Sequence, residues 1–333
     1  MQVPYASSVP LHAPICRRGG APDIVPRHAI TAEKSGRLVR PPERNMTPAQ
    51  KLRAILAEPG CHAVPSCFDA LSAKLIADAG YRLTFMSGFA VSAARLAMPD
   101  TGLISFAEML DTLRNCCAAA PAIPIIGDGD TGYGNALNVQ RTVAEYARAG
   151  AAAVMIEDQV SPKKCGHTKG KEIISREEAR MKIRAAVEAG RSADILVLAR
   201  TDARAVAGFD EALARAKDFV AEGSDIIFLE APENEDEMRR FCGAIARPCM
   251  ANMVIGGQTP VLPPDRLAAL GFKIAIYPLV LLSAAVAAMQ AALAALTPNS
   301  NAPAPPQASF EEMKKIVGFP EYYRRETRYQ AAE

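Results

Sequence analysis

The sequence predicts an α/β protein built as a (β/α)8 barrel, the TIM-type fold. From Cys61 onward, short apolar segments alternate with longer helical patterns, and eight such units fit into about 240 residues. The apolar segments are continuous rather than alternating, which is typical of parallel strands covered by helices on both faces. Polar side chains follow nearly every segment, at the barrel rim where active sites lie.

Each expected strand is a short apolar run, often rich in β-branched residues. The runs span 61–65, 81–87, 123–128, 153–158, 195–201, 226–230, 249–253 and 272–278. Helical patterns follow at 69–79, 105–119, 137–149, 177–190, 210–222, 234–246, 263–270 and 279–296. A doubly wound open sheet is the alternative, because a count of units does not show that the sheet closes.

The two ends of the chain differ from the barrel segment. Residues 1–45 hold seven Pro, a net charge of +4 and no apolar periodicity, so we expect a disordered leader or a mis-assigned start. Thr47 and Pro48 are the expected N-cap and first residue of a helix. The expected catalytic barrel covers 46–296. A Pro-rich linker over 297–309 and a helical tail over 310–333 follow it.

Composition and charge exclude several classes of protein. The formal charge of +2 over 333 residues gives no basic excess for nucleic-acid binding. The uncharged stretch 275–296 contains nine Ala and is interrupted by Pro278, so a buried strand and helix explain it better than a membrane span. Eight Cys without a CxxC pair favour free thiols in the cytoplasm. An organellar transit peptide within residues 1–45 is the alternative location signal.

An acidic motif, GDGDTGYG, follows the third expected strand. It contains GxGxxG, but its carboxylates would repel a phosphate and the helical pattern begins only near Ala136, so the motif does not favour a dinucleotide. Asp128 and Asp130 are two residues apart and point the same way from the strand end. With Glu157 on the next strand they form an oxygen-rich cage that suits Mg²⁺, or Mn²⁺ in its place. Solvated turn acids are the alternative interpretation.

A long polar loop, SPKKCGHTKGKEI, covers 161–173 after the fourth expected strand. Loops of this length between barrel elements are usually functional. Cys165 is flanked by Lys163, Lys164 and His167, and cations favour the thiolate. We therefore expect Cys165 to act as an acid, base or nucleophile; an incidental surface cysteine is the alternative.

Arg200 follows the fifth expected strand in the motif ARTDA. An arginine among acids at a strand end is either a buried ion-pair partner or a bidentate clamp for a substrate carboxylate. The sequence alone does not choose between these two roles.

Taken together, these motifs resemble the isocitrate lyase/phosphoenolpyruvate mutase superfamily. The resemblance runs from about Met46 to Tyr329, and KKCGH, DxDTGxG and ARTDA are highly specific as a set. It is nearest to the branch of 2-alkylmalate (dimethylmalate) lyases, petal death protein and carboxyvinyl-carboxyphosphonate phosphorylmutase-like proteins. The resemblance implies a barrel whose last helix is exchanged between subunits, commonly in a homotetramer. It also implies a small 2-hydroxy or 2-oxo dicarboxylate bound with Mg²⁺.

The resemblance further implies a role for each residue that matches its motifs. The metal ion and its waters would be held by Asp128, Asp130 and Glu157. The substrate carboxylates would be held by Ser87, Gly88, Asn252 and Arg200. The reacting oxygen would lie near Asp100 and Glu230. The gating loop would contain Lys163, Cys165, Gly166 and His167.

Three reactions fit this family: two of them break a carbon–carbon bond, and the third acts on a carbon–phosphorus bond. The first is retro-Claisen cleavage of a 2-alkylmalate or methylisocitrate, with Cys165 as the acid that protonates the nascent carbanion. The second is oxaloacetate hydrolysis or decarboxylation. The third is phosphorylmutase-type C–P chemistry, which the CGH motif disfavours. Ile255 stands where several relatives carry Glu, and it favours a smaller or more apolar substituent, as in alkylmalates.

Overall fold

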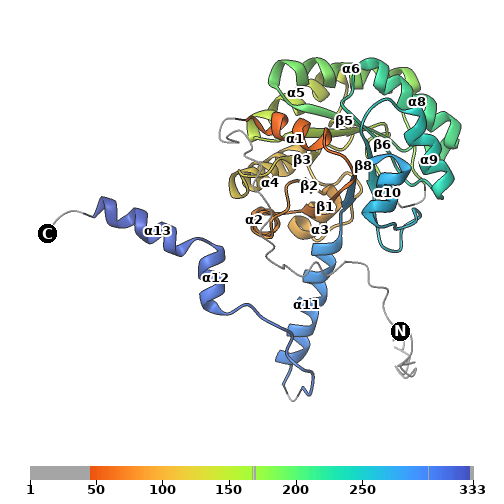
Figure 1. Ribbon diagram of the computed structural model, residues 1–333. Helices are drawn as coiled ribbons and strands as arrows, with labels where there is room; N and C mark the ends of the chain where they lie inside the picture. Colours follow the sequence, from red (N-terminus) through yellow and green to blue (C-terminus); the bar gives the residue numbers. More distant parts are fainter. Residues whose placement is uncertain (1–45, 167, 169, 299, 331–333) are drawn as a thin grey trace, which may run out of the picture. The chain divides into compact units, whose positions relative to one another are not determined.

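The computed structural model describes residues 46–166, 168, 170–298 and 300–330 (Figure 1). Its eight strands are all parallel and pair in chain order from β1 to β8, and β8 pairs back with β1. The register at the closure brings His62 opposite Ile274 and Pro65 opposite Tyr277. The predicted (β/α)8 barrel is therefore confirmed, and the open-sheet alternative is wrong.

The strands lie where the apolar runs predict them, within a few residues at each end. Their bounds are β1 His62–Cys67, β2 Thr84–Met86, β3 Ile125–Asp128, β4 Ala153–Glu157, β5 Leu196–Thr201, β6 Ile226–Leu229, β7 Cys249–Asn252 and β8 Phe272–Tyr277. Every residue of β2 to β6 is buried, which explains why these runs carry no polar alternation.

The predicted helices are also present, together with two that the sequence did not predict. The barrel helices are α1 Pro48–Leu56, α2 Ala70–Asp78, α3 Gly88–Leu96, α4 Phe106–Ala119, α5 Ala136–Ala149, α6 Arg176–Ala193, α7 Ala203–Ala207, α8 Phe209–Glu222, α9 Glu235–Ala244 and α10 Pro264–Leu270. The unpredicted helices are α3 and α7. Ser87, expected at a strand end, is the N-cap of α3 and accepts a hydrogen bond from the amide of Ala90.

Helix α1 begins as its sequence predicts. The Thr47 side chain accepts from the amide of Gln50, and the Gln50 side chain accepts from the amide of Thr47, which is a capping box. Pro48 occupies the first helical position, where its missing amide hydrogen costs nothing.

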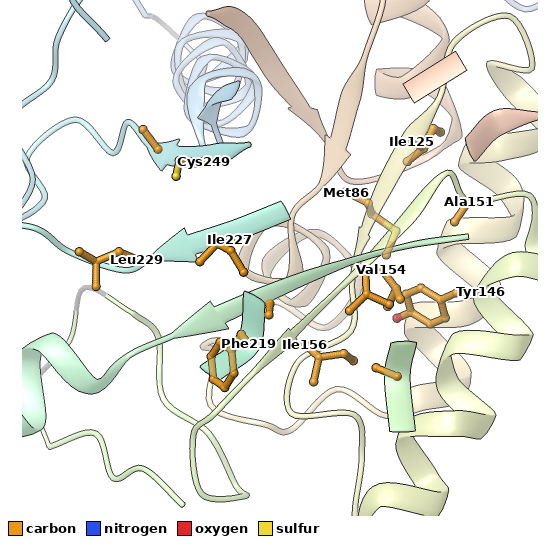
Figure 2. Packing of buried hydrophobic residues seen from close by; sticks show 14 of the residues in the cluster. Met86, Ile125, Tyr146, Ala151, Val154, Ile156, Phe219, Ile227, Leu229 and Cys249 are labelled. Carbon is orange, nitrogen blue, oxygen red and sulfur yellow. The ribbon is translucent and has the colours of Figure 1, made fainter. Parts of the chain in front are cut away.

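Two apolar layers hold the barrel together, one inside the strands and one between the strands and the helices. Met155 on β4 packs in the inner layer, while its neighbours Val154 and Ile156 pack in the outer layer. Figure 2 shows the outer layer, in which Tyr146 of α5 lies against Val154. The alternation follows from the two-residue period of a strand. The layers leave only the strand ends for polar side chains.

The C-terminal elements contribute little to these layers, apart from the partly buried Leu281 at the start of α11. They are α11 Val280–Leu296, α12 Phe310–Ile316, α13 Phe319–Glu326 and a 3₁₀ turn at Thr327–Tyr329, and none of their residues is buried. The expected tail helix is interrupted at Gly318, whose φ of 88° is left-handed. The described residues of the 297–309 linker form no helix or strand. The leader 1–45 lies outside the described residues, and exchange of α11 between subunits is not shown.

No helix in the described part of the chain is long and apolar enough to cross a membrane. The reading of 275–296 as a strand followed by a helix is confirmed, because β8 and α11 share this stretch. The expectation that the helix itself is buried is not met, since α11 is exposed within a single chain.

Candidate active site

A cavity of about 240 Å³ lies at the carboxyl ends of the strands. Residues predicted from the motifs make up half of its wall: Ser87, Asp100, Asp128, Lys163, Cys165, Gly166, Arg200, Glu230 and Asn252. Three further predicted residues, Gly88, Asp130 and Glu157, contact members of this wall. His167 lies outside the described residues. The barrel therefore brings together residues from six strand ends and two loops, the one that carries Asp100 and the polar loop 161–173.

Asp128 ends β3 and is held by two backbone amides. The amide of Gly88 donates to Oδ2 at 3.0 Å, and the amide of Asp130 donates to Oδ1 at 3.1 Å. A Cβ at Gly88 would lie 2.7 Å from Oδ2, so only glycine lets α3 begin this close to the carboxylate. Burial, reinforced by Asp130, raises the pKa of Asp128 to about 6. A nearby cation would stabilise the ionised form of this carboxylate.

The glycines of the GxGxxG pattern are explained by close packing of the backbone and not by nucleotide binding. A Cβ at Gly129 would lie 2.6 Å from the carbonyl oxygen of Met155 on the neighbouring strand. A Cβ at Gly127 would lie 2.9 Å from the ring of Tyr146. The glycines thus allow the acidic turn to sit tightly on β4 and α5.

Lys163 links two of the acids across the mouth of the barrel. Its ammonium lies 2.5 Å from Asp100 Oδ1 and 3.0 Å from Asp130 Oδ1, with all three side chains buried. Burial alone would lower the pKa of Lys163, but Asp130 and the neighbouring carboxylates raise it well above its usual value. Lys163 is therefore a fixed positive charge in the acidic cluster.

The predicted cationic surroundings of Cys165 differ from what the structure shows. The ammonium of Lys163 is bound to Asp100 and Asp130, and that of Lys164 donates to the carbonyl oxygen of Gly170. Both lysines thus have other partners, although they flank the cysteine in sequence. Cys165 itself is half-buried on the cavity wall.

Arg200 sits at the centre of a buried network of acids. It pairs with Asp202 at 2.8 Å and 3.0 Å, with Glu230 at 3.2 Å and with Glu157 at 3.3 Å. Its guanidinium lies over the ring of Phe228, 5.2 Å from the centroid. The ion-pair reading of Arg200 is confirmed. Because Arg200 also lines the cavity, a clamp on a substrate carboxylate remains compatible with its position.

Glu230 and Asn252 face one another from the ends of β6 and β7. The Nδ2 of Asn252 lies 3.4 Å from both carboxylate oxygens of Glu230, which is fully buried. The cavity lining also has an apolar part, which includes Phe89, Val254 and Leu279 and is called the apolar wall below. Ile255 is 63% exposed and does not line the cavity, whereas its neighbour Val254 does.

The residues present fit a hydrated divalent cation rather than a fully protein-bound one. No three His, Cys, Asp or Glu side chains among the described residues are close enough to hold a metal directly. The resemblance implies one direct carboxylate, Asp128, with the others binding waters. Glu157 carries a buried Oε1 without a hydrogen-bond partner, and burial raises its pKa well above the usual range. Mg²⁺ usually keeps several waters, so this donor set suits it.

Sequence reasoning missed two charged residues that belong to this network. Lys171 and Asp202 are buried and paired at 3.0 Å, and Asp202 binds Arg200. The two-residue spacing in ARTDA was a signal for Asp202. Lys171 had no signal, because it is one of four lysines in a polar loop.

This barrel, with buried acids and a cavity at the carboxyl ends of its strands, defines the class as a (β/α)8 enzyme. The family described as Phosphoenolpyruvate phosphomutase matches residues 52–297, and the chain belongs to this family. It is 46% identical over 244 residues to 2,3-dimethylmalate lyase of Eubacterium barkeri, covering 73% of this chain and 84% of that protein. It is 40% identical over 301 residues to the chloroplastic carboxyvinyl-carboxyphosphonate phosphorylmutase of Arabidopsis thaliana, covering 89% of this chain and 88% of that protein.

Solved structures agree with this assignment. A 2,3-dimethylmalate lyase, described as a PEP mutase/isocitrate lyase superfamily member, matches with a TM-score of 0.81 and 32% identity, over 86% of this chain and 97% of that chain. An oxaloacetate acetylhydrolase bound to 3,3-difluorooxalacetate matches with a TM-score of 0.81 and 31% identity, over 84% and 96%. A phosphonopyruvate hydrolase bound to oxalate and Mg²⁺ matches with a TM-score of 0.74 and 31% identity, over 85% and 99%. The predicted superfamily and an enzyme of its lyase type are confirmed.

Proposed function

We propose that this protein is a Mg²⁺-dependent carbon–carbon lyase that cleaves a 2-hydroxy dicarboxylate of the 2-alkylmalate or methylisocitrate type. The reaction is a retro-Claisen cleavage to a 2-oxo acid and a carboxylic acid. The observation that carries the proposal is the shared cavity, which places the acidic cluster, Arg200 and Cys165 around one small space. The names of the similar 2,3-dimethylmalate and 2-methylisocitrate lyases support it.

Binding of the dicarboxylate falls to the polar half of the cavity. Arg200 offers a guanidinium for one carboxylate, and Ser87 and Asn252 offer hydrogen bonds from the ends of β2 and β7. The amide of Gly88 already donates to Asp128, so its contribution is to hold that carboxylate at the start of α3. The apolar wall then receives the alkyl substituent.

Asp128 would hold the metal ion, and Asp130 and Glu157 would hold its waters. Bound there, Mg²⁺ supplies a positive charge that stabilises the oxygens on which negative charge develops. The small size of the cavity suits a short dicarboxylate with one hydrated ion.

The residues of the chain divide the chemistry between proton transfer and charge stabilisation. A base must take the proton of the 2-hydroxyl, and Asp100 and Glu230 both line the cavity. As the carbon–carbon bond breaks, its electron pair passes to the enediolate of the departing acid, and Arg200 stabilises the developing charge. Cys165 then donates the proton that completes the carboxylic acid product.

Oxaloacetate hydrolysis or decarboxylation is the second candidate, and the similar oxaloacetate acetylhydrolase structures favour it. Phosphorylmutase-type C–P chemistry is the third, supported by the plant relative. The position of Cys165 on the cavity wall favours the lyase and oxaloacetate reactions over C–P chemistry, because both of these leave a carbanion that an acid must protonate.

We also propose a domain organisation, an assembly and a location for the chain. Residues 46–296 would form the catalytic barrel, with 297–309 as a linker, 310–333 as a tail and 1–45 as a leader. The assembly would be a homotetramer with exchanged α11 helices. Six of the described cysteines are free thiols, which supports a reducing cytoplasmic location: Cys61, Cys67, Cys116, Cys117, Cys242 and Cys249.

Removal of the metal ion tests the proposal directly. Chelation with excess EDTA should abolish turnover, and added Mg²⁺ or Mn²⁺ should restore it. Asp128→Ala should lose metal affinity and rate together, because Asp128 is the proposed direct ligand. Asp78→Ala, which removes an exposed carboxylate paired with Lys74, should leave both unchanged. Full activity in excess EDTA would refute the metal-dependent mechanism.

A further inference from the structure

Lys171 lies at the root of the polar loop and has none of the roles described above. The backbone on either side of the loop is joined by a hydrogen bond from the amide of Val160 to the carbonyl oxygen of Glu172, at 2.9 Å. The Lys171 side chain is only 2% exposed. Its ammonium therefore extends from a fixed point of the backbone into the protein, and it does not line the cavity.

The ammonium of Lys171 contacts the loop and the barrel at once. It donates to the carbonyl oxygen of Gly166 in the loop and, at 3.0 Å, to Oδ1 of Asp202. Gly166 lies directly on Arg200, since a Cβ at Gly166 would be 2.4 Å from Nη2 of that arginine. One side chain thus joins the loop backbone to the partner of Arg200.

Asp202 is shared between the two cations. Its Oδ2 accepts from Nε of Arg200 at 2.8 Å, and its Oδ1 accepts from Nη2 of Arg200 and from Lys171, each at 3.0 Å. Its own amide donates to Asp158, so backbone and side chain are both fixed. Without Lys171, this buried carboxylate would keep Arg200 as its partner but lose the second contact that sets its orientation.

We propose that Lys171 is a positioning residue that holds the Gly166 backbone and the Arg200 guanidinium in a fixed relation through Asp202. This inference rests on the proposed function, in which Arg200 binds a substrate carboxylate. Loss of Lys171 leaves the carbonyl of Gly166 without its donor and allows the Arg200–Asp202 pair to turn. Affinity for a dicarboxylate then falls although Lys171 touches no substrate.

A purely structural role would give a different result, and Arg215 provides the matched comparison. Arg215 on α8 is also a buried cation, and it pairs with Asp158 at 3.2 Å and Glu211 at 2.8 Å. It supports the same acidic network through Asp158, whose Oδ1 accepts from the amide of Asp202. If Lys171 only neutralised a buried acid, Lys171→Met and Arg215→Met would weaken the protein in the same way.

The experiment measures oxalate binding with Mg²⁺ by calorimetry, which needs no turnover, together with urea unfolding. Lys171→Met should raise the oxalate Kd by about tenfold or more, the effect of one misplaced charged hydrogen bond. Tryptic cleavage after Lys164, measured with saturating oxalate, should become faster because the loop has lost its attachment. Arg215→Met should lower the stability to urea while the folded protein keeps the wild-type oxalate Kd.

Two results would overturn the inference. One is a Lys171→Met protein that binds oxalate and resists trypsin like the wild type. The other is an Arg215→Met protein with the same loss of oxalate affinity. If Lys171→Met does not fold, Lys171→Gln replaces it. This variant keeps a donor for Gly166 but no charge for Asp202, so the oxalate Kd should still rise while cleavage after Lys164 stays close to the wild-type rate, and an unchanged Kd would overturn the inference. Failure of the wild type itself to bind oxalate would remove the proposed function and this inference together.

Discussion

At the residue scale, the site depends on side chains that face the cavity and on buried side chains that hold the first group in place. Asp128 and Cys165 face the cavity, where a substrate would lie. Tyr146 is fully buried and faces away from it, yet its hydroxyl donates to the backbone carbonyl of Asp128 at 2.8 Å. The position of the acidic turn therefore depends on a tyrosine in the outer apolar layer as well as on the residues of the turn.

Replacement of Cys165 tests the assignment of the general acid. Cys165→Ser should lower the lyase rate by about 10²–10⁴-fold, the usual share of one general acid, because a hydroxyl is a far weaker acid than a thiol. Mg²⁺ affinity should survive, and affinity for oxalate should fall much less than the rate. Steady-state kinetics with calorimetry measure all three. Near-normal turnover by Cys165→Ser would leave the loop as a gate and remove the cysteine from the chemistry.

Tyr146→Phe tests the support beneath the acidic turn. The change removes the donor to the carbonyl of Asp128, and an unpaired buried carbonyl costs about 1–3 kcal/mol. We expect the free energy of unfolding in urea to fall by about that amount and the Mg²⁺ affinity to fall with it. Tyr277→Phe, at the half-buried end of β8, serves as the control. Equal stability and metal affinity in the two variants would show that Tyr146 does not position Asp128.

The residues of the motifs were predictable, whereas their partners were not. Asp128, Arg200 and Cys165 stand in short patterns that mark them as candidate site residues, and the family resemblance implies their roles. The role of Lys171 was not predictable, because only the fold brings its ammonium within 3.0 Å of Asp202, a residue 31 positions away. Likewise, nothing in the sequence shows that Lys163 binds Asp100 and Asp130 rather than activating Cys165.

At the scale of elements, strand ends and helix starts explain most of the site. The strands were predicted well because burial on both faces leaves a continuous apolar signal. Helix α3 was missed because it follows β2 directly, with only Ser87 between them. This short connection is also what brings the amide of Gly88 to Asp128. The element that broke the expected pattern therefore contributes to the site.

Helix α11 is the element whose exposure requires an explanation. It carries no charged residue, yet Leu293 is 68% and Leu296 is 80% exposed in a single chain. We expect another copy to cover this apolar surface, so the full chain should elute as a homotetramer in size-exclusion chromatography with light scattering. A Leu293→Glu, Leu296→Glu double variant should shift it to smaller species. Leu137→Glu, at a 71% exposed position on α5, should not. A monomeric wild type at micromolar concentration would contradict the proposed exchange.

At the scale of the whole molecule, the barrel itself was predictable from the sequence, and the substrate was not. Eight apolar runs predict eight strand–helix units, and the pairing of β8 with β1 in the structure shows that the sheet closes. In the proposed function, substrate choice would depend on the apolar wall formed by Phe89, Val254 and Leu279, which come from three separate parts of the chain. Ile255 was the sequence signal for an apolar substituent, but the residue that lines the cavity is Val254.

A substrate panel with Mg²⁺ tests the central claim most directly. Release of the 2-oxo acid is measured for 2-methylmalate, 2,3-dimethylmalate, methylisocitrate and isocitrate, and release of oxalate or pyruvate for oxaloacetate, under identical conditions. We predict the highest kcat/KM for an alkylmalate, because each alkyl group that fits an apolar wall is worth about 10–200-fold in discrimination. Isocitrate should be the poorest of the 2-hydroxy acids, since the described wall offers its third carboxylate Val254 and Leu279 rather than a cation. Turnover of oxaloacetate alone, with no cleavage of any 2-hydroxy dicarboxylate, would contradict the account.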